Sequence, residues 1–352
     1  MPQPLEKARV LIAQHALGGI ITLSPVYIRY MTGLSLSRGT LLVGREKASL
    51  FIDRRYAFAA VSLSPDFEVV VSSSIEEEKA ALKQRLELIS GPVGFDPATT
   101  TVDQFETLSA FGGRLEPCAA LFSVLRRPKS LLEINAIRDA CALCAKGFQF
   151  LLHQLREGVT EVQLVQALKA FWFANGAESI SFDPIIAFGP NSACPHWPSS
   201  SFALEKNATV LIDIGVATQG YHSDMTRTVF FGRPDPEIAA CKAVVLEAYR
   251  LGEQAARPGI SPFALDALVR EYIRSKGYGE FFVHGLGHGV GLQVHEPPRL
   301  SELSPNEPPL GVGDIITIEP GIYLPGRGGV RIENTVVIEL SGARSLIPVP
   351  LE

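Results

Sequence analysis

The sequence predicts two domains that both mix helices and strands: an α/β domain over residues 1–126 and an α+β domain over residues 130–352. The chain has 352 residues, about twice the length of an average domain. Its first part alternates short apolar runs, typical of strands, with amphipathic helical stretches. From residue 180 onward Gly and Pro become dense, and Asp, Glu and His occur inside strand patterns.

In the first part, short apolar and β-branched runs predict strands at residues 18–23, 40–43, 49–53 and 67–71. Helical spacing of apolar residues predicts helices near residues 5–15 and 75–89. This order of elements is typical of a sheet that helices flank.

A linker near residues 126–130 separates the two predicted domains. Pro128 ends any preceding helix. Ser130 and Glu133 form a capping box, which predicts a long helix to about residue 155. Thr160 and Gln163 repeat the pattern before a helix that ends near residue 174. Further helices are expected near residues 236–256 and 262–276, packed on an antiparallel sheet.

The composition narrows the class of protein. With 46% hydrophobic and 20% charged residues the chain is an ordinary globular protein, and its net charge of −5 argues against nucleic-acid binding. No apolar run approaches the 18 residues of a membrane span, and the first residues lack the pattern of a signal peptide. We therefore expect a cytoplasmic protein with no membrane partner.

The five scattered cysteines are not the pattern of a disulfide framework. Cys141 and Cys144 form a CxxC pair, a spacing used in redox and zinc chemistry. Both fall on an apolar stripe with helical spacing, and no second CxxC pair exists to complete a zinc site. The sequence therefore predicts that they are small residues of the core.

The second part holds two candidate hairpins that carry carboxylates. A turn centred between residues 218 and 219 would place Asp213 directly opposite Asp224. A turn centred on Gly326 would place Glu319 directly opposite Glu333. Paired like charges among Ile and Val residues are unfavourable unless a cation lies between them. Carboxylate oxygens favour hard divalent ions, and four carboxylates carry enough charge for two such ions.

Histidines cluster in the same part of the chain. His284, His288 and His295 fall within twelve residues, among glycines at every second position. So many glycines argue against a helix and favour an extended backbone. His196 lies in a loop rich in Pro, Gly and Asn, which suggests a position at a cleft. Neither a GxSxG nor an HExxH motif is present.

In this order, Asp213, Asp224, His288, Glu319 and Glu333 resemble the five metal ligands of the pita-bread dinuclear metallopeptidases. The surrounding motifs also resemble that family: IDIGVATQGYHSDMTRT, HGLGHGVGLQVHEPP, IEPGIY and GVRIEN. The first 125 residues, with the YMTGL and DRRY segments, resemble the smaller amino-terminal domain of the Xaa-Pro peptidases. The resemblance implies a pita-bread catalytic domain that follows an amino-terminal creatinase/prolidase-like domain.

The resemblance also implies roles for the ligands. Asp213 would hold one metal ion, Asp224 and Glu333 would bridge two, and His288 with Glu319 would hold the second. Glu319 would in addition accept the proton of the water that attacks the peptide. Mn²⁺ is the preferred assignment for the ions, with Co²⁺ and Zn²⁺ as alternatives.

Four further residues receive roles from the same resemblance. His196 and His295 would line the substrate site and steady the tetrahedral intermediate, and His284 would lie near the substrate. Arg331 would pair with Asp224 or bind a substrate carboxylate. Trp197 stands where relatives often have a small residue or a second His, so we expect it to narrow the leaving-group side.

The implied activity is that of an Xaa-Pro aminopeptidase, which removes an N-terminal residue that precedes proline. An Xaa-Pro dipeptidase, or prolidase, is the alternative. A non-catalytic peptide-binding module and a two-metal hydrolase of phosphate esters are more remote, because no ligand is lost and few basic residues lie near the ligands. The expected partners are short proline-containing peptides and a second copy of the chain in a homodimer.

Overall fold

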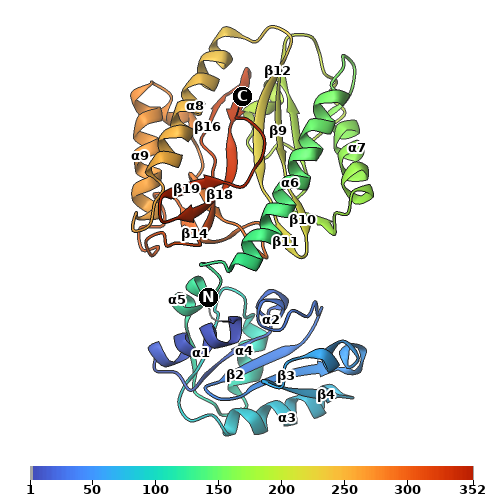
Figure 1. Ribbon diagram of the computed structural model, residues 1–352, viewed down its shortest axis with the longest axis vertical. Helices are drawn as coiled ribbons and strands as arrows, with labels where there is room; N and C mark the ends of the chain where they lie inside the picture. The colour runs from blue at the N-terminus through green and yellow to red at the C-terminus, as the bar shows by residue number, and fades with distance from the viewer. Residues whose placement is uncertain (1–2, 352) are drawn as a thin grey trace. The chain divides into compact units, whose positions relative to one another are not determined.

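A computed structural model describes residues 3–351 of the chain. These residues divide into two compact units, with the division between Arg126 and Arg127 (Figure 1). Each unit has its own sheets and helices, and each is described separately below. Within residues 3–351, none of the helices has the length and apolar character that a membrane span requires.

The first unit is built on a six-stranded mixed sheet with the strand order β4-β3-β2-β1-β5-β6. Strands β1, β2 and β3 pair antiparallel, and the outer pairings are parallel. The strands are β1 (Gly19–Thr22), β2 (Thr40–Gly44), β3 (Ala48–Asp53), β4 (Phe67–Ser72), β5 (Val93–Phe95) and β6 (Leu115–Pro117).

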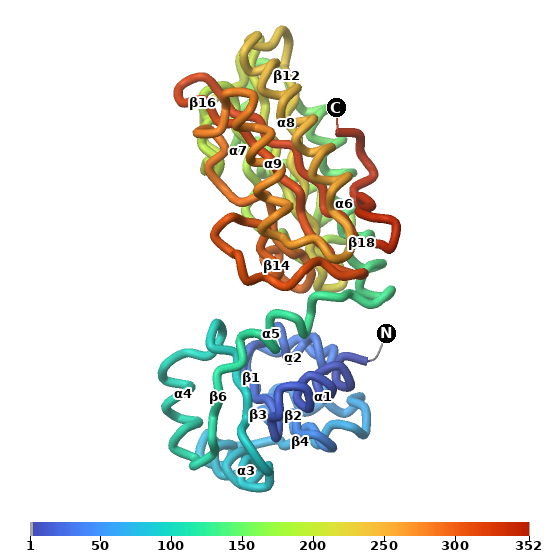
Figure 2. The backbone as a smooth tube through the Cα atoms, turned by 90° about the vertical axis from the view of Figure 1, so that its left-hand side faces the viewer, coloured from blue at the N-terminus to red at the C-terminus, as the bar shows by residue number. Residues whose placement is uncertain are grey.

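Helices cover both faces of this sheet, as Figure 2 shows for α1 and α3. The central strands β1 and β2 are therefore buried on both sides, which their continuous apolar runs anticipate. The helices are α1 (Pro4–Gln14), α2 (Pro25–Thr32), α3 (Ile75–Glu87), α4 (Val102–Ser109) and α5 (Ala119–Leu125), with short 3₁₀ helices η1 (Arg54–Tyr56) and η2 (Ala59–Ser62). The six elements predicted here are confirmed. The sequence analysis missed α2, α4, α5, β5 and β6, which are too short to show a clear period.

The second unit is built on an eight-stranded antiparallel sheet. Its order is β14-β13-β15-β18-β12-β9-β8, and β19 also pairs with β18. The strands are β8 (Ile185–Phe188), β9 (Ala208–Ile214), β12 (Met225–Phe231), β13 (Gly287–Gly289), β14 (Glu296–Leu300), β15 (Ile315–Ile318), β18 (Glu333–Glu339) and β19 (Gly342–Ser345). Two small sheets contain β7 (Ser179–Ile180), β10 (Val216–Thr218) and β11 (Tyr221–His222), and β16 (Gly321–Leu324) with β17 (Gly328–Arg331).

Two pairs of helices pack against this sheet and form two apolar cores (Figure 1). One pair is α6 (Leu131–Gln154) and α7 (Glu161–Ala174), and the other is α8 (Pro236–Ala255) and α9 (Pro262–Ser275), with the 3₁₀ helices η3 (Gly189–Ala193) and η4 (Gly279–Phe281) nearby in sequence. Both predicted capping boxes are present. Cys141 and Cys144 are fully buried in the first core, as their spacing predicts.

The register predicted for the first hairpin is wrong by two residues. Gln219 and Gly220 both have positive φ, at 52° and 75°, and form the two central positions of the turn. Asp213 therefore pairs with Thr226 and not with Asp224. A shift of two residues keeps a side chain on its face of the sheet, whereas a shift of one reverses it. Both carboxylates consequently still reach one cleft.

The register predicted for the second hairpin is confirmed. Ile318 pairs with Asn334, and Gly321 pairs with Arg331, so the fold-back is centred on Gly326. The two arms nevertheless belong to two sheets, because the ladder is interrupted between β15 and β16. Glu319 and Glu333 lie at this interruption, directly after the end of β15 and at the start of β18.

Candidate metal centre

The five residues that resemble metal ligands line one cleft of about 560 Å³. Each comes from the end or edge of a neighbouring strand, since β13, β15, β18, β12 and β9 are consecutive in the large sheet. Strands in this order bring side chains from distant parts of the sequence to one place. The five are Asp213 in β9, Asp224 just before β12, His288 in β13, Glu319 just after β15 and Glu333 at the start of β18.

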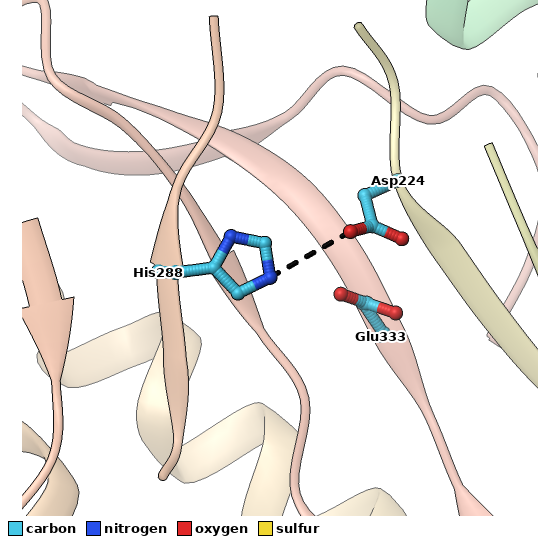
Figure 3. Close-up of side chains that lie close together, drawn as sticks. All are labelled: Asp224, His288 and Glu333. Carbon is cyan, nitrogen blue, oxygen red and sulfur yellow. Dashed lines mark ion pairs between the residues drawn. The ribbon is translucent and has the colours of Figure 1, made fainter. Parts of the chain in front are cut away.

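Three of these side chains form a tight group. Ligand atoms of Asp224, His288 and Glu333 all lie within 4.8 Å of one another, and the imidazole faces both carboxylates (Figure 3). His288 Nε2 is 3.6 Å from Asp224 Oδ2 and 3.4 Å from Oε1 of Glu319. Glu319 thus adjoins the group on the imidazole side.

The protein environment disfavours charge on these groups when no cation is bound. Burial, together with the charge of Asp213, raises the pKa of Glu333 to about 8. Burial and the carboxylate of Glu333 also hold the pKa values of Asp224 and Glu319 well above their usual range. Burial and the neighbouring His295 lower the pKa of His288 to about 3. A neutral imidazole among crowded carboxylates is a donor set that a divalent cation suits.

Asp213 provides a direct test of this fit. Its side chain is buried, and within residues 3–351 its Oδ1 atom has no hydrogen-bond partner. A buried carboxylate oxygen without a partner is costly, and a bound cation removes that cost. The residues present therefore fit divalent metal ions.

Two threonines orient the carboxylates, and the sequence analysis did not identify them. Thr226 Oγ1 donates to Glu333 Oε2 over 2.6 Å. Thr317 Oγ1 donates to Glu319 Oε1 over 3.3 Å and accepts from the backbone N–H of His288 over 3.1 Å. Thr is common in strands, so neither residue carries a sequence signal for this role.

Arg331 contacts a different carboxylate from the one expected. Its Nη2 donates to Asp213 Oδ2 over 2.5 Å, and not to Asp224, because Arg331 projects from β17 toward the end of β9. Its Nε donates to Thr226 Oγ1, and its Nη1 donates to the hydroxyl of Tyr323 over 2.6 Å. The guanidinium is therefore held on three sides.

Tyr323 links Arg331 to His284 and was also missed. His284 Nδ1 lies 2.8 Å from the carbonyl of Gly285 and donates to it, because a carbonyl only accepts. In the neutral imidazole Nε2 then has no proton, so it accepts from the Tyr323 hydroxyl over 2.8 Å, and that hydroxyl in turn accepts from Arg331. Burial and Arg331 lower the pKa of His284 to about 3, which agrees with this neutral form.

The two remaining predicted histidines also line the cleft. The His295 ring stands edge-on to that of His288, with centroids 4.2 Å apart. Burial and His196 lower the pKa of His295. His196 lies beyond η3 and is exposed to the cleft.

Trp197 does not take the expected position. Its indole Nε1 donates to Glu161 over 3.0 Å, and its ring packs against the cluster of Ala187, Leu211 and Tyr323. Among the described residues that line the cleft, its neighbours Pro195 and His196 are present and Trp197 is not. The expectation that this indole narrows the leaving-group side is therefore wrong, because the side chain turns back toward α7.

Comparison with known proteins decides the family. Residues 135–339 match the family model described as metallopeptidase family M24, and residues 4–127 match the creatinase/prolidase N-terminal domain. The chain belongs to metallopeptidase family M24. It is therefore a peptide hydrolase of the pita-bread fold, from a family that uses divalent metal ions.

Three similar proteins cover nearly the whole M24 chain. The "Xaa-Pro dipeptidase" of Pyrococcus furiosus is 34% identical and covers 98% of each chain. The solved structure "Xaa-Pro dipeptidase from Bacillus anthracis" has a TM-score of 0.93 at 32% identity, and covers 99% of this chain and 98% of its own. The "X-Pro aminopeptidase from Thermotoga maritima" has a TM-score of 0.86 at 32% identity, and covers 97% of this chain and 98% of its own.

One further residue of the M24 cleft was missed by the sequence analysis. Arg299 in β14 pairs directly with His288 in β13, and it lines the cleft while remaining exposed. Side chains of directly paired residues lie on the same face of a sheet, about 5 Å apart at Cβ. Arg299 directly follows the HGLGHGVGLQVHEPP segment, but its place in the cleft can be inferred only once the register of β13 and β14 is known.

Proposed function

We propose that this M24 peptidase is an Xaa-Pro dipeptidase, which hydrolyses dipeptides whose second residue is proline. The observation that carries the proposal is the position of Arg299, directly across from His288 in the cleft. A dipeptide has a free carboxylate close to its scissile bond, and an exposed guanidinium beside the metal centre suits that group. The names of the relatives from Pyrococcus furiosus and Bacillus anthracis support the same choice.

We further propose that five residues hold two divalent ions: Asp213, Asp224, His288, Glu319 and Glu333. Mn²⁺ is the proposed metal, with Co²⁺ and Zn²⁺ as alternatives, since carboxylates outnumber the single imidazole. When bound, the ions would polarise the scissile carbonyl and lower the pKa of a water molecule.

The residues around this centre would then divide the remaining work. Glu319, which is half-buried and oriented by Thr317, would accept the proton of the attacking water. His196 and His295 would donate hydrogen bonds to the oxygen that gains charge in the transition state. Arg331 would hold Asp213, and His284 would keep its neutral form through Tyr323.

The domain boundaries are part of the proposal. The amino-terminal domain would comprise residues 1–126 and the catalytic domain residues 130–352. The two compact units and the two family matches support this division. All residues of the proposed centre then belong to the catalytic domain.

A competition experiment tests the proposed substrate class. Purified protein with added Mn²⁺ would receive Ala-Pro and Ala-Pro-Ala together, beside an EDTA control, and mass spectrometry would follow both. We expect Ala-Pro to disappear first and EDTA to abolish its cleavage. Equal cleavage of the tripeptide would instead support an aminopeptidase, and no cleavage of either peptide with metal bound would refute both activities.

The role of Arg299 needs its own comparison. Arg299→Gln removes the cation and leaves a shorter, neutral polar side chain. We expect a rise in KM of about tenfold or more for Ala-Pro, and little change for Ala-Pro-amide, which lacks the carboxylate. An equal effect on the two substrates would show that Arg299 does not bind the carboxylate.

A further inference from the structure

Glu161 is a buried carboxylate outside the proposed metal centre. It occupies the first turn of α7 and is 0% exposed. A buried carboxylate is unfavourable unless hydrogen bonds satisfy it. Glu161 is satisfied almost entirely by one loop, which spans residues 188–200.

The two oxygens of Glu161 accept from both ends of this loop. Oε1 accepts from the backbone N–H of Phe188 over 2.8 Å and from Asn191 Nδ2 over 2.9 Å. Oε2 accepts from Trp197 Nε1 over 3.0 Å, and from both the N–H and the hydroxyl of Ser200 over 2.8 Å. One side chain thus joins the start of the loop to its end.

The loop presents Pro195 and His196 to the cleft of the metal centre. Among residues 3–351, no hydrogen bond fixes the imidazole of His196, which is exposed. Its position therefore depends on the backbone that carries it. Ser192 ties the middle of that backbone to β17 by accepting from the N–H of Gly329 over 2.8 Å. Glu161 holds the segment that follows, through Trp197.

The five donors around Glu161 require a side chain that only accepts hydrogen bonds. An ionised carboxylate has about four lone-pair directions and carries no hydrogen that would clash with a donor. A glutamine amide at this position would turn its NH₂ group toward two or three of the donors. The loop would then lose hydrogen bonds at one of its two ends.

We propose that Glu161 is a positioning residue for His196 in peptide hydrolysis, acting through the loop over residues 188–200. This inference rests on the proposed peptidase function for its kinetic consequence. His196 then meets the reacting group in a fixed geometry only while the loop stays closed on Glu161. A misplacement of about 1 Å in such a group lowers turnover by up to about 100-fold.

A double-mutant cycle on Ala-Pro hydrolysis tests the proposal. Glu161→Gln should lower kcat about tenfold or more with little change in KM. In a His196→Ala background the same change should alter kcat less than twofold, because the group that it positions is already absent. Multiplicative effects in the double variant, or a kcat for Glu161→Gln within twofold of wild type, would overturn the proposal.

Glu133→Gln is the matched control. Glu133 also lies in the first turn of a helix, α6, and its carboxylate accepts from Tyr221 and from the N–H of Ser130. It is not among the described residues that line the cleft. We expect this variant to retain wild-type kcat and to show no coupling to His196→Ala.

Trp197 gives a readout that does not depend on activity. The chain has two tryptophans, and Trp172 is fully buried in the first core of the catalytic unit. In Glu161→Gln the Trp197 indole loses its hydrogen bond to Oε2 and becomes more exposed to water, so its fluorescence emission should shift to longer wavelength. The emission of the buried Trp172 should stay constant. An unchanged spectrum would overturn the proposal, whereas an inactive wild-type enzyme with the shift present would count against the proposed function alone. Should Glu161→Gln fail to fold, Trp197→Phe removes one of the five hydrogen bonds and enters the same cycle, with the same outcomes.

Discussion

The crowded carboxylates predict that the metal-free protein loses stability as the pH rises. Glu333 has a pKa of about 8 in the fold, against an ordinary value of 4.5. Between these values the folded protein keeps a proton that the unfolded chain has released. The folded state then binds more protons, so its stability falls with increasing pH. Asp224 and Glu319, whose pKa values are also raised, act in the same direction.

The magnitude follows from the pKa of Glu333. Between pH 6.5 and pH 9, this group alone should lower the free energy of unfolding by about 2 kcal/mol. For a unit of this size, that loss corresponds to about 4 to 8 °C in Tm. His284 and His288 have pKa values near 3 in the fold, so they act in the opposite direction around their ordinary value of 6.5. Each adds about 0.4 kcal/mol of stability between pH 6.5 and pH 9, because the unfolded chain loses its half-bound proton there, and together they offset less than half of the Glu333 effect.

Differential scanning fluorimetry after dialysis against EDTA would measure this slope between pH 6.5 and pH 9. Added Mn²⁺ should raise Tm more at pH 8 than at pH 6.5, because the cation displaces the protons that the carboxylates hold. The isosteric variant Glu333→Gln should show a clearly smaller slope without metal. A metal-free Tm that stays constant across the window, or an unchanged slope in the variant, would refute the reasoning.

Three further predictions concern residues around the centre. Tyr323→Phe should lower kcat roughly tenfold with little change in KM, since it removes the hydroxyl between Arg331 and His284, and steady-state kinetics on Ala-Pro would detect it. Lys129→Met should lower the free energy of unfolding by about 3 to 5 kcal/mol in urea titrations, because Glu296 is 1% exposed and loses its cation at 2.6 Å. Adding Glu296→Gln should recover most of that loss, and its failure to do so would show that packing dominates. Trp197→Gly should lower kcat on Ala-Pro and on Ala-Pro-Ala by the same factor, because the indole holds the loop on Glu161 and does not line the cleft, and unequal factors in steady-state kinetics would contradict this.

Much of the catalytic unit could be predicted because its helices and strands follow local rules. Capping boxes begin α6 and α7 where the sequence places them, and the apolar stripe of α6 is buried. The turn centred on Gly326 gives the register of both arms correctly. The first turn was misplaced because Gln219 takes a positive φ, which a non-glycine residue seldom does. Its two-residue error left the site prediction intact.

Some expectations are still predictions. The ligand roles, the metal, the homodimer and the cytoplasmic location all derive from resemblance or composition. The structure brings the nine predicted site residues to one cleft, which is the geometry that those roles need. Activity measurements and metal analysis will test the roles themselves.

The residues that sequence reasoning missed share a physical cause. Thr226, Thr317 and Tyr323 act through hydrogen bonds to residues of other strands, and such bonds depend on register rather than on a motif. Arg299 acquires its place only through the pairing of β13 with β14. A resemblance to known ligands identifies the groups that touch a metal, because their chemistry restricts the residue types allowed there.

Residues that orient those groups are less restricted, and Glu161 illustrates the consequence. In sequence it is an ordinary acidic residue in the first turn of a helix, where a negative charge is favourable on its own account. Only the three-dimensional fold reveals that its five hydrogen bonds belong to a loop some thirty residues away. The cap of α7 is Thr160, so the five donors to Glu161 all come from the loop, and full burial distinguishes Glu161 from the exposed Glu76 and Glu77 in the first turn of α3. Full burial of a helix-terminal acid beside a catalytic loop is therefore the feature to seek when positioning residues are sought in other members of this family.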